Sequence, residues 1–533
     1  MWPQVYDPIA GSLGASALVA SIPIVVLLVL LGVFRVPSWI AALAGFAAAL
    51  GVAVFAYGMP IGLALSSATY GGAQGLLPIS WIVFTALLLY KLTVETGKFE
   101  ILKNSIGGLT RDQRLQALLI AFAFGAFIEG AAGFGTPVAV AAAMLAGLGF
   151  PPFFAAAICL LANTAPVAFG SIGTPLIMLQ AVTKLPLSTL SADTGRLCAP
   201  VSVFIPAYLM LVMGGWGALR AVAPAAIVCG LAFSSVQFFV SNTLGPNLTD
   251  ILASIAAMAA LVALMKVWRP KGVAAADVPD HTSRQAMAAW IPYGLLVVFV
   301  LVWGWPASKA VLDRATIVIA WPGLHNLVQR VAPITTAPSP YGAIFNLNLL
   351  SASGTSCLFA VFASALALRV SPGKLVSWTG DVAKQLALPI LTIFTVVALA
   401  FVMNYSGQTA TLGLALAGTG KGFPFFSPLL GWLGVFLTGS DTSANALFGN
   451  LQIVTASRLG FNPSLMASAN SAGGVMGKMI SLSSIAIAVA AAQMPRTEEA
   501  RLFRFTLKHS VLLASIMGLL TLFYAYVAPT WVR

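Results

Sequence analysis

Residues Leu13–Phe34 read LGASALVASIPIVVLLVLLGVF, a run without a single charge. A helix of about twenty apolar residues is long enough to cross the hydrocarbon core of a bilayer. No basic segment precedes the run and no small-residue cleavage site follows it, so it predicts a first membrane span rather than a signal peptide. Similar runs of about 17 to 22 residues recur along the whole chain, which predicts a polytopic membrane protein.

The composition supports that prediction. Of 533 residues, 59% are apolar and 8% are charged, and the mean hydropathy is +0.96. A soluble protein would carry about 25% charged residues. The spans must be helices, because a lone strand cannot satisfy its backbone groups in lipid. The net charge is +13, but the charged residues are too sparse to form a nucleic-acid-binding face. In a membrane protein an excess of Lys and Arg is typical of cytoplasmic loops held near anionic lipid.

Neither a metal site nor an enzyme is indicated. The four cysteines, Cys159, Cys198, Cys229 and Cys357, lie in or beside apolar runs without the spacing of metal ligands, so we expect small buried hydrophobic side chains. The apolar segments hold no His-rich cluster and no Ser/His/Asp set. We therefore expect no catalytic residue, no metal and no cofactor.

Both halves of the chain carry the same short motifs in the same order. Each half has a stretch bounded by two prolines, then a span, then three sequence matches at similar distances. The matching pairs are Pro60–Pro78 with Pro372–Pro389, Phe127–Gly130 with Phe436–Gly439, Leu148–Pro152 with Leu459–Pro463, and Ala162–Ala165 with Ala469–Ala472. Internal repeats of this kind are common in secondary transporters.

The orientation of the repeats follows from the number of spans between them. Seven predicted spans, an odd number, separate the two proline-bounded stretches, so the repeats are predicted to be inverted across the membrane. The resulting topology places most Lys and Arg residues in cytoplasmic loops, as the positive-inside rule requires. We predict an all-α protein with about twelve transmembrane helices, two re-entrant hairpins, two interrupted helices and both termini periplasmic.

The predicted organisation has three parts. The first repeat, with extra linking helices, covers 1–268, a cytoplasmic linker covers 269–288, and the second repeat covers 289–533. The predicted hairpins are 115–150 and 426–460, the predicted interrupted helices are 153–183 and 463–494, and 306–340 is an outer insertion of undefined structure.

Four segments interrupt the apolar helices with Gly, Pro, Ser, Thr and Asn. They are Glu129–Pro137, Asn163–Pro175, Thr438–Asn445 and Asn470–Lys478. Irregular backbone at membrane depth survives only where it is buried in protein or lines a wet cavity, and the helix N-termini exposed there suit a carboxylate. The alternative is that these are packing glycines and proline kinks; their occurrence in repeat-related pairs favours a binding site.

The candidate residues of this site have three roles. Those predicted to bind substrate are Asn163, Thr164, Ser171, Thr174, Thr442, Ser443, Asn470, Ser471 and Lys478. Glycines that shape the hairpin backbone are Gly130, Gly133, Gly135 and Gly439. The two acids found within the membrane, Glu129 and Asp441, are the predicted proton carriers, because burial disfavours a charged carboxylate. The alternatives are a capping role for Asp441 and snorkelling for Lys478.

Several of these motifs resemble those of the bacterial lactate permease family. They are Phe127–Val140 (FIEGAAGFGTPVAV), Leu161–Pro175 (LANTAPVAFGSIGTP), Gly439–Asn450 (GSDTSANALFGN) and the opening Trp2–Pro8. The resemblance implies proton-coupled import of L-lactate, D-lactate and often glycolate across the bacterial inner membrane. The family is similar in organisation to a wider ion-transporter superfamily, which implies an elevator-like movement.

The resemblance also implies the partners. We expect lactate or glycolate, protons and the lipid bilayer, no nucleic acid, and consider a homodimer as the assembly. The competing hypothesis is a sodium-coupled dicarboxylate transporter. Its two substrate carboxylates would require more intramembrane cations than Lys478 alone. An intramembrane enzyme and a channel are less favoured by the residues and by the inverted repeats.

Overall fold

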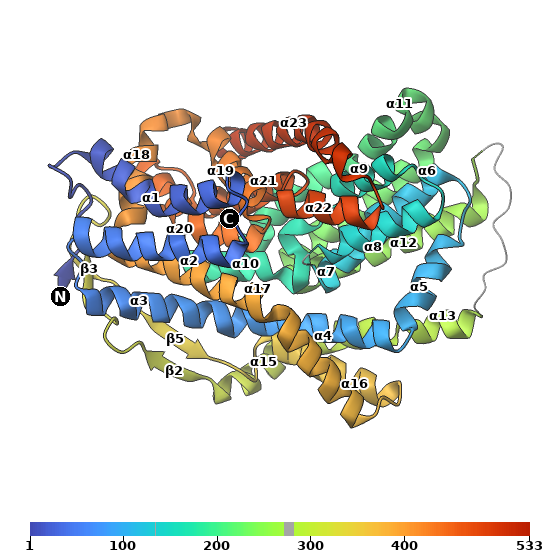
Figure 1. Cartoon of the computed structure of the whole chain (residues 1–533), viewed down its shortest axis with the longest axis horizontal. Coiled ribbons are helices and arrows are strands. Elements are labelled where there is room, and N and C mark those ends of the chain that lie inside the picture. The colour runs from blue at the N-terminus through green and yellow to red at the C-terminus, as the bar shows by residue number, and fades with distance from the viewer. Residues whose placement is uncertain (134, 271–281, 533) are drawn as a thin grey trace.

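The computed structural model describes residues 1–133, 135–270 and 282–532. Figure 1 shows a bundle of helices, many of which run roughly along the long axis of the molecule. Among the described residues, nine helices are long and apolar enough to cross a membrane, or up to eleven if each bent pair is one span. The predicted all-α polytopic membrane protein is confirmed, and its count of twelve spans stays a prediction.

The helices follow one another along the whole chain. Those of the first half are α1 (Leu13–Gly32), α2 (Ser38–Gly51), α3 (Ile61–Gln74), α4 (Trp81–Glu95), α5 (Lys98–Gly107), α6 (Gln113–Gln116), α7 (Gly125–Ala131), α8 (Thr136–Gly147), α9 (Pro152–Ala162), α10 (Gly170–Thr183), α11 (Leu187–Thr243) and α12 (Thr249–Val267). Those of the second half are α13 (Ser283–Ala289), α14 (Ile291–Gly304), α15 (Pro306–Leu312), α16 (Ser353–Ala367), α17 (Pro372–Ser406), α18 (Gln408–Leu416), α19 (Phe423–Thr438), α20 (Asp441–Leu459), α21 (Pro463–Lys478), α22 (Leu482–Ala491) and α23 (Glu499–Tyr526).

Short turns of π-helix or 3-10 helix join several of these elements. They are η1 (Val52–Ala56) after α2, η2 (Gly75–Ser80) between α3 and α4, η3 (Ala117–Phe124) between α6 and α7, η4 (Val167–Phe169) before α10 and η5 (Pro246–Leu248) before α12. Within α11 the backbone leaves helical geometry at Gly214, Gly215 and Val222. This long element is therefore two helices joined by a turn.

Each of the two proline-bounded stretches of the sequence continues into the span that follows it, and the two resulting helices have equal length. Ile61–Glu95 and Pro372–Ser406 each run for 35 residues and pack against each other. The close approach depends on glycine, because a Cβ atom added at Gly71 would come within 2.7 Å of the Val397 carbonyl oxygen. Together with α1 and α2 they form a body beside the hairpins (Figure 1).

The segments predicted as hairpins each consist of two helical arms. In the first, η3 and α7 form one arm, which ends at Ala131, and α8, which begins at Thr136, returns along them. In the second, α19 and α20 pack against each other around Gly439 and Ser440. The next helix in the first half bends by 62° between α9 and α10. Re-entry of the hairpins to their own side of the membrane stays a prediction.

The predicted break at Asn470–Lys478 is wrong. These residues continue α21 without interruption to Lys478, and α22 begins at Leu482, so the predicted interrupted helix 463–494 is interrupted at 479–481 instead. The glycines pack α21 onto the α19 backbone instead: a Cβ atom would lie 2.0 Å from the Pro428 carbonyl oxygen at Gly473, and 2.3 Å from that of Trp432 at Gly477. Small residues that let two backbones approach are typical of helix contacts in membranes, so here the packing alternative holds.

The insertion at 306–340 has a defined structure in small β elements. The strands are β1 (Trp2–Pro3), β2 (Ile317–Ala320), β3 (Val328–Arg330), β4 (Ser339–Pro340) and β5 (Ile344–Leu347). They form a three-stranded sheet of order β1-β3-β4 and a two-stranded antiparallel sheet of β2 with β5. The N-terminus is thereby tied to the insertion at one end of the molecule, and α5 and α13 lie toward the other end (Figure 1). Residues 271–281 of the predicted linker lie outside the described residues.

Candidate functional site

Both hairpin tips line one cavity of about 430 Å³. The first turns of α10 and α22 complete this side of the wall, and residues of α2 and α17 form the opposite side. The polar and charged side chains on the wall are Ser38, Glu129, Ser171, Thr174, Thr392, Thr438, Ser440, Asp441, Thr442, Ser443, Lys478, Ser483 and Ser484. A larger hollow of about 1090 Å³ between α5, α6 and α8 is lined by neither hairpin acid, so it lies away from this chemistry.

Three regular helices begin at the cavity wall. Gly135 precedes α8, Thr442 and Ser443 lie in the first turn of α20, and Ser483 and Ser484 lie in the first turn of α22. A helix N-terminus carries about half a positive charge and has free N–H groups, which together favour a bound anion. Their convergence makes the cavity suitable for a small anion.

Hairpin one contributes Glu129 from α7. The side chain is buried and lies against the start of α10, since a Cβ atom at Gly170 would come 2.7 Å from Oε1. Among the described residues, Glu129 Oε2 has no hydrogen-bond partner. Asn163 lies beside it, but neither its amide nitrogen nor its oxygen forms a hydrogen bond there. An ionised carboxylate is costly in such surroundings, whereas a neutral acid is tolerated.

The start of α10 has a strained backbone. Ser171, Ile172 and Gly173 have φ angles of 46°, 57° and 76°, and the left-handed region is unfavourable for a β-branched residue such as isoleucine. Strain of this kind persists where the surrounding structure enforces it and is concentrated at functional sites. The Ser171 hydroxyl donates to the Ala132 carbonyl at 3.0 Å, so the strained turn is tied to the tip of hairpin one.

Hairpin two contributes Asp441 at the start of α20. Its Oδ2 accepts a hydrogen bond from the Ser471 hydroxyl at 2.6 Å and a longer one from the Asn445 amide at 3.4 Å. Asn470 donates to the Asn445 oxygen at 2.9 Å, and Gln452 donates to the Asn470 oxygen at 3.1 Å. The acid therefore belongs to a continuous buried polar network that joins α20 to α21.

The cap of α20 is Ser440. Its hydroxyl accepts from the Ser443 backbone nitrogen at 3.3 Å, and Asp441 is the first residue inside the helix. The alternative that Asp441 itself caps this helix is therefore wrong. Its carboxylate turns instead toward Ser471 and Asn445.

Lys478 lies between the two acids. Its ammonium donates to the Gly439 carbonyl at 2.6 Å, and its charge acts on both Glu129 and Asp441. Lys478 is the single cation on the cavity wall among the described residues. One cation is thus available to two carboxylates and to any anion that enters the cavity.

The sequence matches the L-lactate permease family over residues 16–528. The chain belongs to this family. Glycolate permease GlcA of Escherichia coli K12 is 45% identical over 552 residues, covering 99% of this chain and 98% of that protein. An L-lactate permease of Bacillus subtilis 168 is 45% identical, covering 98% of each, and one of E. coli K12 is 43% identical, covering 100% of this chain and 99% of that protein.

Permeases are membrane transporters, so this permease is a multi-pass transporter by family. Among solved structures, the MtrF antimetabolite efflux pump of Neisseria gonorrhoeae is similar with a TM-score of 0.46 and 14% sequence identity, covering 86% of this chain and 83% of that chain.

The structure brings many of the predicted site residues of the permease together on the cavity wall. Those that line it are Ser171, Thr174, Thr442, Ser443, Lys478, Glu129, Asp441, Gly135 and Gly439. The other substrate candidates and two glycines are not among the lining residues: Asn163, Thr164, Asn470, Ser471, Gly130 and Gly133. Asn470 and Ser471 are fully buried in the network around Asp441, and a Cβ atom at Gly133 would lie 1.9 Å from the Ser171 hydroxyl.

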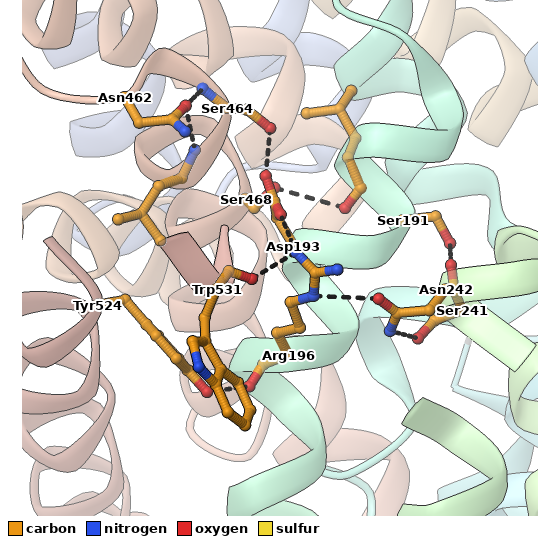
Figure 2. A network of polar contacts seen from close by, with 12 residues as sticks. Ser191, Asp193, Arg196, Ser241, Asn242, Asn462, Ser464, Ser468, Tyr524 and Trp531 are labelled. Atoms are coloured by element: carbon orange, nitrogen blue, oxygen red, sulfur yellow. Dashed lines mark hydrogen bonds and ion pairs between the residues drawn. The ribbon is translucent and has the colours of Figure 1, made fainter. Parts of the chain in front are cut away.

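Besides Asp112 at the start of α6, the permease has two further buried acids that the sequence analysis missed. Asp193 and Asp250 are 0% and 1% exposed. Asp193 accepts from the Ser464 hydroxyl at 2.5 Å and pairs with Arg196 at 3.4 Å. Figure 2 shows this network joining α11 to α21, and Arg196 also donates to the Trp531 carbonyl near the C-terminus.

Neither acid has a clear signal in the sequence. Asp193 stands in a polar stretch that is typical of an outer loop, and Asp250 stands at the beginning of an apolar run. An acid in the first turn of a helix is usually explained by the helix dipole and solvent. The lining residues Ser38, Trp39 and Thr392 were also missed, because only the packing of α2 and α17 against the hairpins brings them to the cavity.

Proposed function

We propose that this permease imports L-lactate, D-lactate and glycolate together with a proton across the bacterial inner membrane. The observation that carries the proposal is the single cavity in which three helix N-termini, one lysine and two hairpin acids meet. Its volume of about 430 Å³ lies in the range of small-molecule sites. The relatives named above, an E. coli glycolate permease and L-lactate permeases, support 2-hydroxymonocarboxylates as the substrate class.

In the proposed complex the substrate carboxylate pairs with the Lys478 ammonium and the N-termini of α20 and α22. The hydroxyls of Ser171, Thr174, Thr442 and Ser443 are the groups proposed to bind the substrate 2-hydroxyl. The single cation favours a monocarboxylate over a dicarboxylate, whose second charge would stay unpaired at a cost. Four residues that were predicted to contact the substrate are instead proposed to support the side chains of the cavity wall: Asn163, Thr164, Asn470 and Ser471.

Proton coupling is proposed to act through Lys478. While Glu129 is ionised, it attracts the ammonium and competes with the substrate carboxylate. A proton taken from the outer water neutralises Glu129 and leaves Lys478 to the lactate anion. Loss of that proton to the cytoplasm restores the competing charge and favours release. Asp441 is the competing candidate for the same role.

Alternating access is proposed to be elevator-like. The moving part would comprise the two hairpins with α9, α10, α21 and α22, and the fixed part would include α3, α4 and α17. The cavity lies where these groups of helices meet, which is where a rigid-body movement would expose it alternately to the two sides. The proposed inverted repeats, 1–268 and 289–533, supply one hairpin each, and the protein is proposed to act in the bilayer alone or as a homodimer.

Both termini are proposed to be periplasmic, with 98–114 inside and 407–424 outside. Single cysteines at the exposed positions Asn104 and Thr419 can test this with an impermeant maleimide on intact cells. We expect labelling of Thr419→Cys alone. The native cysteines are buried and should stay unlabelled. Equal labelling of both positions would contradict the inverted arrangement.

The transport function can be tested in proteoliposomes. An acid-outside pH gradient should drive accumulation of labelled lactate without sodium, and glycolate and D-lactate should compete. Accumulation that follows a sodium gradient and ignores the pH gradient would favour the sodium-coupled alternative instead. Preferential competition by a dicarboxylate would contradict the proposed substrate class.

A further inference from the structure

Asp250 is an enclosed acid that the proposed coupling step does not use. It is 1% exposed and lies in the first turn of α12. Among the described residues, neither of its carboxyl oxygens has a hydrogen-bond partner. Leaving a buried carboxylate ionised without partners costs far more than leaving a neutral acid there.

The structure places Asp250 directly behind hairpin one. A Cβ atom added at Gly130 would lie 2.9 Å from the Asp250 Cβ atom and 3.1 Å from the Ile251 nitrogen. Glycine at this position therefore allows the first turn of α12 to pack against the residue next to Glu129. The charges of Asp250 and Glu129 are close enough to act on each other.

A second buried polar group also lacks a partner at this point. Asn163 is 4% exposed and lies beside Glu129, yet both of its amide atoms lack hydrogen-bond partners among the described residues. Asn163 and Asp250, each of which neighbours Glu129, thus both have unused hydrogen-bonding capacity. Buried polar groups are rarely left in this state unless they have a functional role.

Charge decides which of the two acids keeps a proton. Two adjacent buried carboxyls cannot both ionise, because each charge raises the cost of the other. Lys478 acts on Glu129 from the cavity side, so Glu129 is the member whose ionised form is supported. The resident proton then belongs to Asp250, which is not among the residues that line the cavity.

We propose that Asp250 keeps its proton through the transport cycle and donates a hydrogen bond to Glu129 whenever Glu129 is ionised. Asp250 is then a positioning residue that sets the pH at which the permease loads its proton. This inference rests on the proposed coupling through Glu129 and adds a second acid to it.

The surroundings of α12 offer few other groups that could titrate with the pair. Its packing partners η3, η5 and α10 have no ionisable side chain. The ionisable side chains of α7 and α11 are Glu129, the Cys198 and Cys229 thiols, Tyr208, Arg220 and the Asp193–Arg196 ion pair. Of these, Glu129 and Cys198 are the groups whose electrostatic interaction with Asp250 is resolved.

The test compares two variants of the full-length permease in proteoliposomes. Asp250→Asn keeps a neutral donor, so the dependence of lactate uptake on external pH should stay within a few tenths of a unit of the wild type. Asp250→Val has no donor, so ionised Glu129 loses support and the half-maximal pH should rise by about one to two units. A role in packing alone would change the amount of active protein and leave both profiles in place.

Infrared spectroscopy of the purified permease gives a second readout that does not depend on transport. We expect the carbonyl stretch of a protonated carboxyl that persists across the pH range and is missing in Asp250→Asn. The inference is overturned if that band is unaffected, or if Asp250→Val leaves the pH profile unchanged. It is also overturned if Asp250→Asn exchanges lactate without accumulating it, since Asp250 would then carry the moving proton itself.

Failure of the proposed function would look different. In that case wild-type vesicles would not accumulate lactate under a pH gradient, while the infrared band would still report whether Asp250 is protonated. If Asp250→Val does not fold, the infrared band and the coupling of Asp250→Asn decide the inference between them.

Discussion

The two hairpins present one acid each to the same cavity, but they hold it differently. Asp441 accepts two hydrogen bonds and is part of a network that continues through Asn445 to Gln452. One oxygen of each acid, Glu129 Oε2 and Asp441 Oδ1, has no hydrogen-bond partner among the described residues, and Asn163 beside Glu129 has none either. The contrast therefore lies in the network that holds Oδ2 of Asp441. Fixed donors stabilise the charged form of a carboxyl. In the proposed transport cycle we therefore expect hairpin two to keep a constant charge pattern and hairpin one to change its own.

The backbone shows the same contrast. In the first half the helix after the hairpin breaks at Asn163 and turns through the strained residues 171–173. In the second half, α21 runs unbroken past Asn470, and its glycines pack against α19. Related sequence motifs thus form a strained polar break in one half and a tight helix pair in the other.

Lys478 acts on the acids of both hairpins, so its loss should have the largest effect on transport. In Lys478→Gln the substrate carboxylate loses its cation in a buried site, an effect of about 2 to 5 kcal/mol. We expect uptake at low lactate concentration to fall by at least roughly 30-fold. The measurement is initial uptake of labelled lactate in proteoliposomes.

Lys91→Gln is the matched control. Lys91 pairs with Glu95 at 2.9 Å, in a partly exposed position away from the cavity wall. Exposed pairs of this kind contribute about 1 kcal/mol or less, so uptake should change less than roughly fivefold. Similar losses of lactate uptake in the two variants would show that Lys478 has no special role in the site. The proposal that Lys478 connects the two hairpins would then be contradicted.

The second prediction separates the two acids. Glu129→Gln mimics the protonated form, so it should exchange lactate across the membrane yet lose accumulation, which is about tenfold for a gradient of one pH unit in a one-to-one symporter. Asp441→Asn should slow transport by disturbing the network but keep pH-driven accumulation. Accumulation and exchange are measured in the same vesicles. The reverse pattern would transfer the coupling role to Asp441.

The fold was largely predictable because its main determinant is local. Long uncharged runs such as Leu13–Phe34 must be helices in a bilayer. The paired prolines marked related elements in the two halves, but in the structure each stretch joins the predicted span after it in one 35-residue helix. The segment 470–478 was misassigned because glycine serves both breaks and close helix contacts. Only the position of the α19 backbone, which the sequence does not show, decides between them.

The charged residues of the candidate site were predictable, because a charged side chain is energetically costly in lipid. Glu129, Asp441 and Lys478 stand out in apolar segments, and all three line the cavity. Asp250 was missed because an acid at the start of an apolar run is usually solvated; its burial results from the close approach of α12 to Gly130. The α2 and α17 wall was missed because it is created by tertiary packing and has no motif.

A smaller effect is expected from the substrate 2-hydroxyl, which the hydroxyls of both halves are proposed to bind. Propionate lacks this group and would leave a buried partner unsatisfied, which costs about 1 kcal/mol or more. It should compete with lactate at least roughly fivefold more weakly. Ser171→Ala and Ser443→Ala should each reduce the difference between lactate and propionate as competitors. The variant with the larger reduction shows which half of the protein binds the hydroxyl. Equal competition by propionate would contradict the assignment.

The last prediction tests whether hairpin two is indeed the fixed half. Ser471→Ala removes the 2.6 Å hydrogen bond to Asp441 and should lower the stability of the purified permease by about 1 kcal/mol, a shift of roughly one to three degrees in the melting temperature.

Ser254→Ala is the matched control, because this buried serine bonds only to the Ile251 carbonyl of its own helix. Such a back-bond contributes little to stability, so its melting temperature should stay close to that of the wild type. A fixed network also predicts that the loss in Ser471→Ala is reduced when Asp441→Ala is already present, since each change removes the Ser471–Asp441 hydrogen bond. The hydrogen bond from Asn445 to Ser471 is lost in Ser471→Ala alone. Additive losses would mean that Ser471 stabilises α21 independently of the acid. The contrast between a held Asp441 and a free Glu129 would then no longer explain why the two hairpins differ.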